Sequence, residues 1–319
     1  MLKVVIIGYG DMFTNMIAGT LDSGSQIVGV FRHDRVKYPR PVRWIKDLLF
    51  SDCDYNYIQS YKLHEIKAKS ANSESFRRQL LKLNPDIMIV ASWSEKIKKE
   101  IFNIPKIATI NVHPSLLPKY RGPNPYMQTI LHEEKQSGVT FHLMDENFDS
   151  GAILDQRTVE ITQSDTAKEL KAKTVLKARG AICELLEKLS EDVIFPIAQN
   201  EANASYFSTD FDAEILFKDN ASKISAQIRC IHPWSNTYFF TRKSVLVPNP
   251  YQITITENTT QYTEPGCVVD VNIKDRSLTI VTGDNKLIRL GGLKLYGPIN
   301  RFFTEAALKH IHIGEIVEP

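Results

Sequence analysis

The first half of the chain alternates short apolar runs with stretches in which apolar residues recur at helical spacing. The runs are nearly continuous and rich in β-branched residues, which is typical of parallel strands buried on both faces. They span residues 3–7, 26–31, 86–91 and 108–112. Residues 75–83 and 94–102 have helical spacing, and each stretch opens with a serine that can cap a helix. The alternation predicts an α/β fold with an open sheet and right-handed crossovers.

The second half of the chain has a different pattern. Residues 165–189 predict one long helix, in which Gly180 lowers the helical propensity. Residues 191–212 have weak periodicity and predict a linker. After one further helix, short β-rich runs alternate with turn signals, which predicts a small β-barrel. The expected organisation is a first domain at 1–190, the linker, and a second domain at 213–319.

Composition places the chain among globular proteins. It has 319 residues, of which 43% are hydrophobic and 24% charged, so disorder and a disulfide miniprotein are disfavoured and two domains are expected. No run approaches the ~18 apolar residues of a membrane span. The apolar N-terminal run stops at Gly8 without a cleavage site, so we expect no targeting segment. The four scattered cysteines contain no CxxC pair, which fits reduced thiols in the cytoplasm.

Charge gives little support to a strongly basic nucleic-acid surface. The net charge is +2, and the residues from Tyr206 to Pro319 contain 12 basic and 12 acidic side chains. Neither half has the basic excess that drives phosphate neutralisation. A basic, proline-broken loop at 32–43 fits either an anionic substrate or a solvated surface. His310 and His312 have no evident third partner, so we predict no metal site.

A glycine pair after the first strand is a weak signal. Gly8 and Gly10 begin a GxGxxG fingerprint, but Phe13 stands where the third glycine is needed. No convincing acidic residue ends the second strand, so a nicotinamide oxidoreductase is a minor hypothesis. A tight strand-to-helix turn that needs small residues is the favoured interpretation.

The strongest chemical signal lies at the end of the strand at 108–112. Asn111 and His113 are two residues apart, so their side chains point the same way from an extended chain. This is the carboxyl edge at which open α/β sheets bind ligands, and several carboxylates follow at 145–151. A histidine base, an amide for an oxyanion and a carboxylate for the imidazolium suffice for acyl transfer to an amine. A structural histidine is the alternative. Ser115 lies outside a GxSxG elbow and is expected to shape its loop.

Residues 111–151 carry a motif series that resembles the folate-dependent formyltransferase superfamily: Asn-x-His, Ser-Leu-Leu-Pro, Arg-Gly and Asp-x-Gly, in this order. The resemblance implies a Rossmann-like α/β domain, with 10-formyltetrahydrofolate as the formyl donor and co-substrate. It matches Asn111, His113 and Asp149 to the catalytic trio of that family. The residues that it assigns to folate contact are Ser115, Leu116, Leu117 and Pro118, and a looser match places Trp93 in the segment that lines the pterin pocket.

A second resemblance covers residues 228–234, which read Ile-Arg-Cys-Ile-His-Pro-Trp. The segment is similar to a motif in the C-terminal domain of methionyl-tRNA formyltransferases, which is an OB-like barrel. This resemblance implies a role in protein biosynthesis, with initiator methionyl-tRNA as the acceptor. Glycinamide ribonucleotide formyltransferases resemble the first domain only, so the length of the chain disfavours them.

Three departures from the methionyl-tRNA formyltransferase pattern concern the acceptor. The basic loop after Asp34-Arg35 is short, the second domain carries no net charge, and residues 122–126 read Gly-Pro-Asn-Pro-Tyr in place of Gly-Ala-Ala-Pro-Ile. Sugar-nucleotide N-formyltransferases share His-Pro-Ser-Leu-Leu-Pro, so an amino-sugar nucleotide is the alternative acceptor. A non-catalytic folate- or RNA-binding paralogue is a lesser hypothesis, because the trio is intact. The sequence leaves the oligomeric state open.

Overall fold

The chain divides into two compact units, each built from several segments of the sequence. The computed structural model describes residues 1–32, 53–242, 244–296 and 300–317. The first unit comprises residues 1–125, 137–160 and 171–207, and the second comprises 126–136, 161–170 and 208–319. The stretch 191–212 is therefore divided between the units. The predicted domain boundaries on either side of it stay predictions.

The first unit is built on a six-stranded sheet with the order β2-β1-β3-β4-β5-β6. Its strands are β1 (Lys3–Gly8), β2 (Gln26–Arg32), β3 (Ile87–Ala91), β4 (Ala108–His113), β5 (Gln136–Leu143) and β6 (Ile153–Glu160). The first four strands pair in parallel, and β5 pairs with β4 in antiparallel register. The predicted α/β fold with an open, largely parallel sheet is confirmed.

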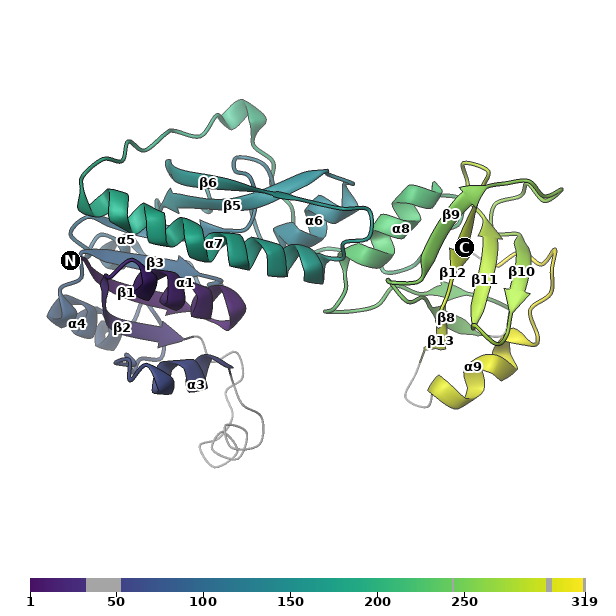
Figure 1. Ribbon diagram of the computed structural model, residues 1–319, viewed down its shortest axis with the longest axis horizontal. Helices are drawn as coiled ribbons and strands as arrows, with labels where there is room; N and C mark the ends of the chain where they lie inside the picture. Colours follow the sequence, from purple (N-terminus) through teal and green to yellow (C-terminus); the bar gives the residue numbers. More distant parts are fainter. Residues whose placement is uncertain (33–52, 243, 297–299, 318–319) are drawn as a thin grey trace. The chain divides into compact units, whose positions relative to one another are not determined.

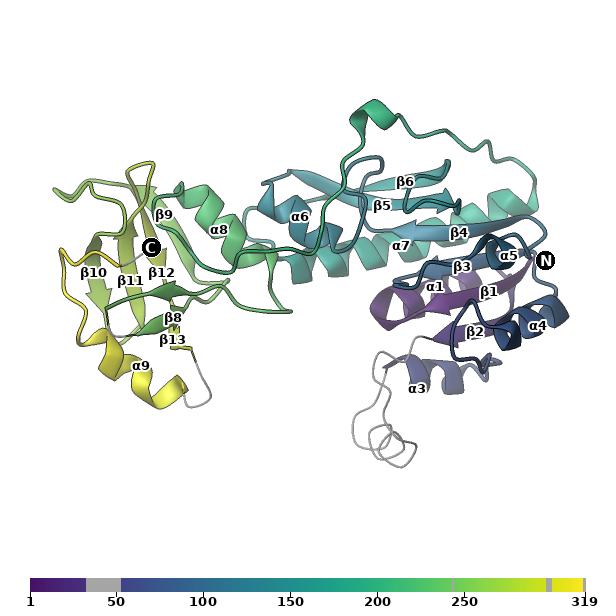
Figure 2. The same cartoon turned by 180° about the vertical axis from the view of Figure 1, so that it is seen from behind.

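Helices cover both faces of this sheet (Figures 1 and 2). They are α1 (Gly10–Asp22), α3 (Cys53–Ser60), α4 (Glu74–Leu83), α5 (Lys99–Phe102) and α7 (Ala167–Ser190). Successive residues of a strand face opposite sides, so Val4 packs with α1 and α7 whereas Val5 packs with α4 and α5. A Cβ atom at Gly19 would lie 2.4 Å from the Arg179 carbonyl oxygen. Glycine is therefore needed for α1 to approach α7 this closely.

Two predicted helices differ from the structure at their beginnings. Ser73 caps α4, because its hydroxyl accepts a backbone hydrogen bond of 3.2 Å from the first turn, and Ser75 is already helical. The helix predicted at 94–102 is wrong over its first half. There the Glu95 carboxylate accepts a hydrogen bond of 3.0 Å from the Ala71 amide, and only α5 is helical. α7 continues without a break through its central glycine.

The second unit is mainly antiparallel β structure. Its two sheets have the orders β10-β11-β12-β9 and β13-β8-β7. Their strands are β7 (Phe239–Phe240), β8 (Val245–Val247), β9 (Ile253–Glu257), β10 (Val268–Asn272), β11 (Ser277–Val281), β12 (Lys286–Leu290) and β13 (Lys294–Leu295), and the accompanying helices are α6 (Pro125–Leu131), α8 (Ala221–Cys230) and α9 (Asn300–Leu308). Ile224 of α8 and Ile280 of β11 share one buried core. An antiparallel C-terminal β domain is confirmed, and its description as an OB-like barrel stays a prediction.

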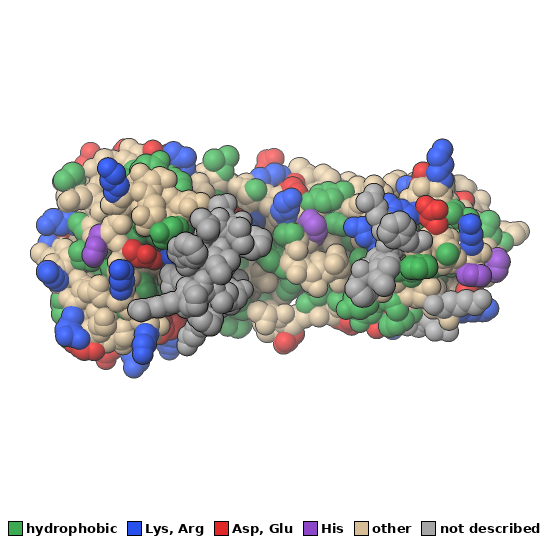
Figure 3. All heavy atoms as spheres, turned by 90° about the horizontal axis from the view of Figure 1, so that it is seen from below, with side chains coloured by type: hydrophobic (Ala, Val, Ile, Leu, Met, Phe, Trp, Pro, Cys, Tyr) green, Lys and Arg blue, Asp and Glu red, His purple; other side chains and the backbone are tan. Residues whose placement is uncertain are grey.

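The surface carries dispersed charge. On the face shown in Figure 3, Lys and Arg side chains stand singly among acidic and apolar ones, and the described residues form no continuous basic patch there. The basic loop expected at 32–43, except Arg32, and the Asp34-Arg35 departure lie outside the described residues. Within the described ranges, no helix is both long and apolar enough to cross a membrane.

Candidate active site

Strand β4 and the loop after β5 bring the three predicted catalytic residues together. Asn111 and His113 lie two residues apart on β4, with the core residue Val112 between them. Asp149 lies in the loop that follows β5. Antiparallel β5 ends beside Ile110, near the beginning of β4, and the loop turns back to bring Asp149 to Asn111 and His113. Asp149 Oδ1 is 3.2 Å from Asn111 Nδ2 and 3.5 Å from His113 Nδ1. One carboxylate oxygen therefore faces both side chains.

The hydrogen bonds of His113 show which ring nitrogen is available as a base. Its Nε2 is 2.8 Å from the Tyr120 carbonyl oxygen, which can only accept, so Nε2 carries the hydrogen. In the neutral ring, Nδ1 is then the basic nitrogen, and it faces Asp149. Burial lowers the pKa of His113 from its ordinary value and outweighs the opposing attraction of Asp149. The imidazole is therefore neutral at neutral pH and able to take up a proton.

Asp149 is held in the ionised form. Burial alone would raise its pKa, but attraction to His113 once that ring is protonated, together with the backbone N–H of Gly122, brings the pKa to about 2. The Gly122 amide donates to Oδ2 at 2.9 Å. The Asp149 backbone is left-handed, with φ 56°, a conformation that a non-glycine residue adopts at some cost and that needs support from its surroundings.

His142 of β5 is a fourth polar residue of the site, and the sequence analysis missed it. It lies opposite Asn111 in the β4–β5 register and is buried. Its Nδ1 is 2.8 Å from the Leu143 carbonyl oxygen and its Nε2 is 3.0 Å from Asn111 Nδ2. A carbonyl only accepts and an amide NH₂ only donates, so Nδ1 carries the hydrogen and Nε2 accepts. His142 thereby fixes the orientation of the Asn111 amide.

The loop predicted to contact folate is held in shape by its own hydrogen bonds. Ser115 is fully buried, and its hydroxyl donates to the Lys119 carbonyl oxygen at 2.8 Å. The Leu117 amide donates to Thr140 Oγ1 at 3.2 Å, and the Leu117-Pro118 peptide is cis. Leu116 packs on β5 at Gly138. A Cβ atom at this position would lie 2.5 Å from the Leu116 side chain, so only glycine leaves room for it. The loop is thus a fixed wall beside His113, while its contact with folate stays a prediction.

Trp93 follows β3, whose last residue Ala91 pairs with Val112 of β4, and its ring centroid is 5.4 Å from that of Phe31. Both side chains belong to the core cluster on the α4 and α5 side of the sheet. The structure gives it a packing role there, and its assignment to a pterin pocket stays a prediction.

A cavity of about 410 Å³ adjoins the site, and part of its wall comes from the stretch expected to be a linker. Arg121 makes two hydrogen bonds to the Glu201 carboxylate, of 2.9 and 2.7 Å. Ser205 Oγ accepts from the Tyr120 amide at 2.9 Å. The cavity is lined by Arg121, Asn147, Phe148, Ser150, Glu201, Ala204, Ser205 and Tyr206. These contacts join residues about 80 positions apart, which no local sequence pattern indicates.

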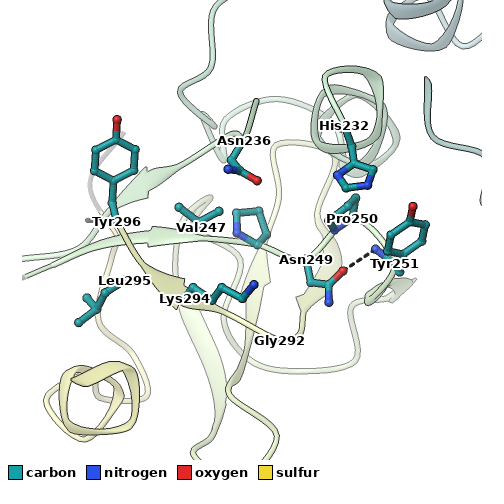
Figure 4. Close-up of a pocket in the computed structure, with 11 residues that line it drawn as sticks. His232, Asn236, Val247, Asn249, Pro250, Tyr251, Gly292, Lys294, Leu295 and Tyr296 are labelled. Atoms are coloured by element: carbon teal, nitrogen blue, oxygen red, sulfur yellow. Dashed lines mark hydrogen bonds between the residues drawn. The ribbon is translucent and has the colours of Figure 1, made fainter. Parts of the chain in front are cut away.

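The second unit has a separate cavity of about 500 Å³ (Figure 4). It is lined by His232, Asn236, Val247, Pro248, Asn249, Pro250, Tyr251, Gly292, Lys294, Leu295 and Tyr296. Tyr251 and Tyr296 are 53% and 68% exposed, so both rings are open to a partner. Among the described residues, no group of three or more His, Cys, Asp and Glu side chains could hold a metal ion.

Comparison with known families agrees with the fold. Residues 2–186 match the family described as "Formyl transferase", and residues 208–298 match "Formyl transferase, C-terminal domain". The chain belongs to the formyltransferase family, and the predicted class of enzyme is therefore confirmed.

Similar proteins carry two kinds of name. The methionyl-tRNA formyltransferase of Buchnera aphidicola subsp. Acyrthosiphon pisum (strain Tuc7) is 36% identical over 193 residues, which are 60% of this chain and 62% of that protein, less than two thirds of its length. The methionyl-tRNA formyltransferase of Ehrlichia canis (strain Jake) is 27% identical over 283 residues, 88% of this chain and 90% of that protein. The solved structure of the N-formyltransferase from Helicobacter canadensis in complex with folinic acid and dTDP-3-aminofucose has a TM-score of 0.68 at 22% identity, and the match covers 93% of this chain and all of that one. At this identity, the structural likeness shows the fold alone.

Proposed function

We propose that the protein transfers a formyl group from 10-formyltetrahydrofolate to a primary amine, with initiator methionyl-tRNA as the acceptor. The observation that carries the proposal is the arrangement of a buried, neutral His113 beside an ionised Asp149 and the Asn111 amide. Acyl transfer to an amine needs a base, a partner for the resulting cation and a donor to an oxyanion, and these three groups supply them.

His113 is the proposed general base. As the amine nitrogen of the acceptor bonds to the formyl carbon, Nδ1 of His113 accepts the proton that the amine loses. Asp149 then faces an imidazolium instead of a neutral ring, and its charge stabilises that state. The donor supplies the formyl carbon, and its own nitrogen is the leaving group. This nitrogen takes the proton from the His113 imidazolium as the bond to carbon breaks, which returns the ring to its neutral form. The products are the N-formylated acceptor and tetrahydrofolate.

Asn111 is the proposed oxyanion donor. Both of its N–H groups are engaged in the structure, one with His142 and one with Asp149. The bond to Asp149 is the longer, at 3.2 Å against 3.0 Å, so it is the one to be exchanged for the formyl oxygen as negative charge develops there. The His142 bond keeps the amide oriented during the exchange.

The donor is assigned from the loop and from the family. The loop at 115–118 stands beside His113 in a fixed shape, and rigid backbone groups suit recognition of a flat heteroaromatic ligand. The Helicobacter canadensis structure was solved with folinic acid, a folate derivative. Ser115, Leu116, Leu117, Pro118 and, more loosely, Trp93 are the residues proposed to contact the donor.

Initiator methionyl-tRNA is favoured as acceptor by the names of the relatives and by the second unit. The cavity of the second unit is lined by the exposed rings of Tyr251 and Tyr296 and by Lys294. Aromatic rings with a nearby cation are suited to stacking on unpaired bases and to a phosphate. Phe239 is buried in the core and cannot contact an acceptor, whereas Phe240 is 36% exposed. We place the reaction in the cytoplasm and in protein biosynthesis on the same grounds.

An amino-sugar nucleotide is the second candidate acceptor. The observation that favours it is the 410 Å³ cavity beside the trio, because small-molecule sites occupy about 300–1,000 Å³. The Helicobacter canadensis structure, which has this fold, was solved with dTDP-3-aminofucose.

The test is formyl transfer from 10-formyltetrahydrofolate, assayed in parallel with methionyl-initiator tRNA and with a panel of amino-sugar nucleotides. We expect transfer to the tRNA. Transfer to a nucleotide sugar alone would contradict the proposed acceptor and support the proposed formyl-transfer reaction. Donor binding without transfer to either acceptor would contradict the enzymatic role and favour a non-catalytic paralogue.

A further inference from the structure

Gln199 lies in the stretch that the sequence predicts to be a linker, yet it reaches the candidate active site. Ile197, two residues earlier, forms an isolated β-bridge with Ile153 at the start of β6, with two hydrogen bonds of 2.8 Å. This bridge fixes the path of the segment along the edge of the first unit. Gln199 is half-buried, whereas Ile197 is exposed, so the side chain of Gln199 turns inward from a surface strand.

The carboxamide of Gln199 is fully used. Its Nε2 donates to the carbonyl oxygens of Asp149 and Gly151, at 2.9 and 2.8 Å. Its Oε1 accepts from Nε and Nη2 of Arg121, at 3.2 and 2.7 Å. Carbonyl oxygens only accept and a guanidinium only donates, so the orientation of the amide has one solution. The four bonds join two loops that are separate in the sequence.

Both of these loops determine the surroundings of His113. The loop that contains Arg121 also supplies the Tyr120 carbonyl oxygen, which holds His113 Nε2 at 2.8 Å, and the Gly122 amide, which donates to the Asp149 carboxylate at 2.9 Å. The other loop supplies Asp149 itself, with its left-handed backbone at φ 56°. Gln199 ties the backbone of the residue that carries the carboxylate to the loop that orients the imidazole.

We infer that Gln199 is a positioning residue for the formyl-transfer reaction, and that its two N–H donors hold the Asp149 carboxylate at its distance from His113 Nδ1. The inference rests on the proposed function for its kinetic consequence. The side chain of Gln199 hydrogen-bonds two backbone carbonyls and Arg121, so its effect on the reaction passes through Asp149 and His113. The segment at 193–207 therefore helps to hold the active-site loops in place, through Gln199.

Two variants of nearly the same size separate the bonds of Gln199. Gln199→Glu keeps an oxygen acceptor for Arg121 and loses both N–H donors, and Gln199→Met loses all four bonds. We expect kcat to fall about 10–100-fold in both variants, with the KM for 10-formyltetrahydrofolate changed by less than about threefold, because supporting groups of a site have effects of this size without touching the substrate. A Gln199→Glu variant with wild-type kcat would overturn the inference.

Gln227 provides a matched control. Its Nε2 also bridges two backbone carbonyls, those of Asp212 and Glu214, at 2.9 and 2.8 Å, in the second unit. We expect Gln227→Glu to lower the melting temperature about as much as Gln199→Glu and to keep kcat within about twofold of wild type. An equal loss of kcat in Gln227→Glu would show that broken carbonyl bridges act through stability alone, and would overturn the positioning role.

A second measurement does not depend on turnover. The groups that face His113 are Asp149, which raises its pKa, and His142 and Arg121, which lower it. Gln199→Met adds no charge, so a carboxylate that moves away from the ring lowers the pKa of His113 further, and NMR titration of labelled histidine measures this. An unchanged titration midpoint would overturn the inference. If the wild-type chain transfers formyl to neither acceptor, the proposed function fails and the titration still decides the role of Gln199.

Discussion

The candidate active site of the first unit and the cavity of the second unit expose their polar groups to very different degrees. In the first unit, Asn111 and Asp149 each make two side-chain hydrogen bonds and the His113 ring makes one, and the side chains of His113 and Asp149 are only 6% and 11% exposed. In the second unit, the rings of Tyr251 and Tyr296 are more than half exposed. Fixed, desolvated groups suit a transition state, whereas open aromatic rings suit a large and adaptable partner. The contrast agrees with the proposal that the first unit carries the chemistry and the second recognises the acceptor.

The largest expected effect comes from removing the base. In His113→Ala we expect kcat for formyl transfer to fall about 10²–10⁴-fold, which is the usual contribution of general base catalysis. Donor binding should persist, because the loop at 115–118 keeps its own hydrogen bonds. Steady-state kinetics and equilibrium binding of the donor measure the two properties. The control is His64→Ala, which removes an exposed imidazole of the same unit, and turnover close to wild type in His113→Ala would contradict the assigned role.

Removing the oxyanion donor should have the next largest effect. In Asn111→Ala we expect kcat to fall about 10²–10³-fold with little change in the KM for the donor, as for loss of one such donor elsewhere. The reason is that the bond to the formyl oxygen strengthens only as charge develops. A change confined to KM would instead assign Asn111 to binding of the substrate in its ground state.

The second unit is tested by truncating an exposed ring. In Tyr296→Ala we expect the KM for methionyl-initiator tRNA to rise about 5–100-fold, because stacking of one base on an aromatic ring contributes about 1–3 kcal/mol, while kcat stays near wild type. Phe303→Ala is the control, since Phe303 is an exposed ring of α9 outside the cavity. Equal KM values in the two variants would show that the cavity does not recognise the acceptor. They would contradict the proposal that the two units have separate roles.

The smallest expected effect is that of Asp149 on the free energy of unfolding at acid pH. Its pKa in the folded chain, about 2, lies below the unfolded value of ~3.9, so its ionised form stabilises the fold at neutral pH and this contribution is lost as the pH falls from about 5 to 2. The difference amounts to about 2–3 kcal/mol. The free energy of unfolding of Asp149→Asn should therefore decline less steeply over this range than that of wild type, as measured by urea denaturation. Parallel declines would show that the carboxylate is not ionised in the folded site.

The sequence predicts the parts of the site that depend on local rules. The spacing of Asn111 and His113 on a strand follows from the two-residue repeat of extended chains, whereas the choice of Asp149 among several nearby carboxylates came from the family resemblance. His142 carries a weaker signal, a polar residue inside an apolar strand, and its importance appears only from its register with Asn111. Register between strands is a long-range property, which the sequence of one strand does not contain.

Gln199 had no local signal at all. Its surroundings are polar and weakly periodic, which is the composition of a linker, and its partner Arg121 is 78 residues away. Loop contacts of this kind arise from the whole fold, so neither propensity nor periodicity can predict them. The helix expected from Ser94 failed for a related reason, since the Glu95 carboxylate binds backbone and side-chain groups of a distant segment.

Helix α7 has a consequence for how this protein can be divided or recombined. Its first turn, up to Leu170, belongs to the second unit and the remainder to the first. The second unit also takes residues 126–136 from the middle of the other unit's sequence. A chimera that exchanges the second unit between relatives therefore needs several junctions in the sequence, and one of them falls inside helix α7. A single crossover after residue 207 would separate residues 126–136 and 161–170 from the rest of the second unit.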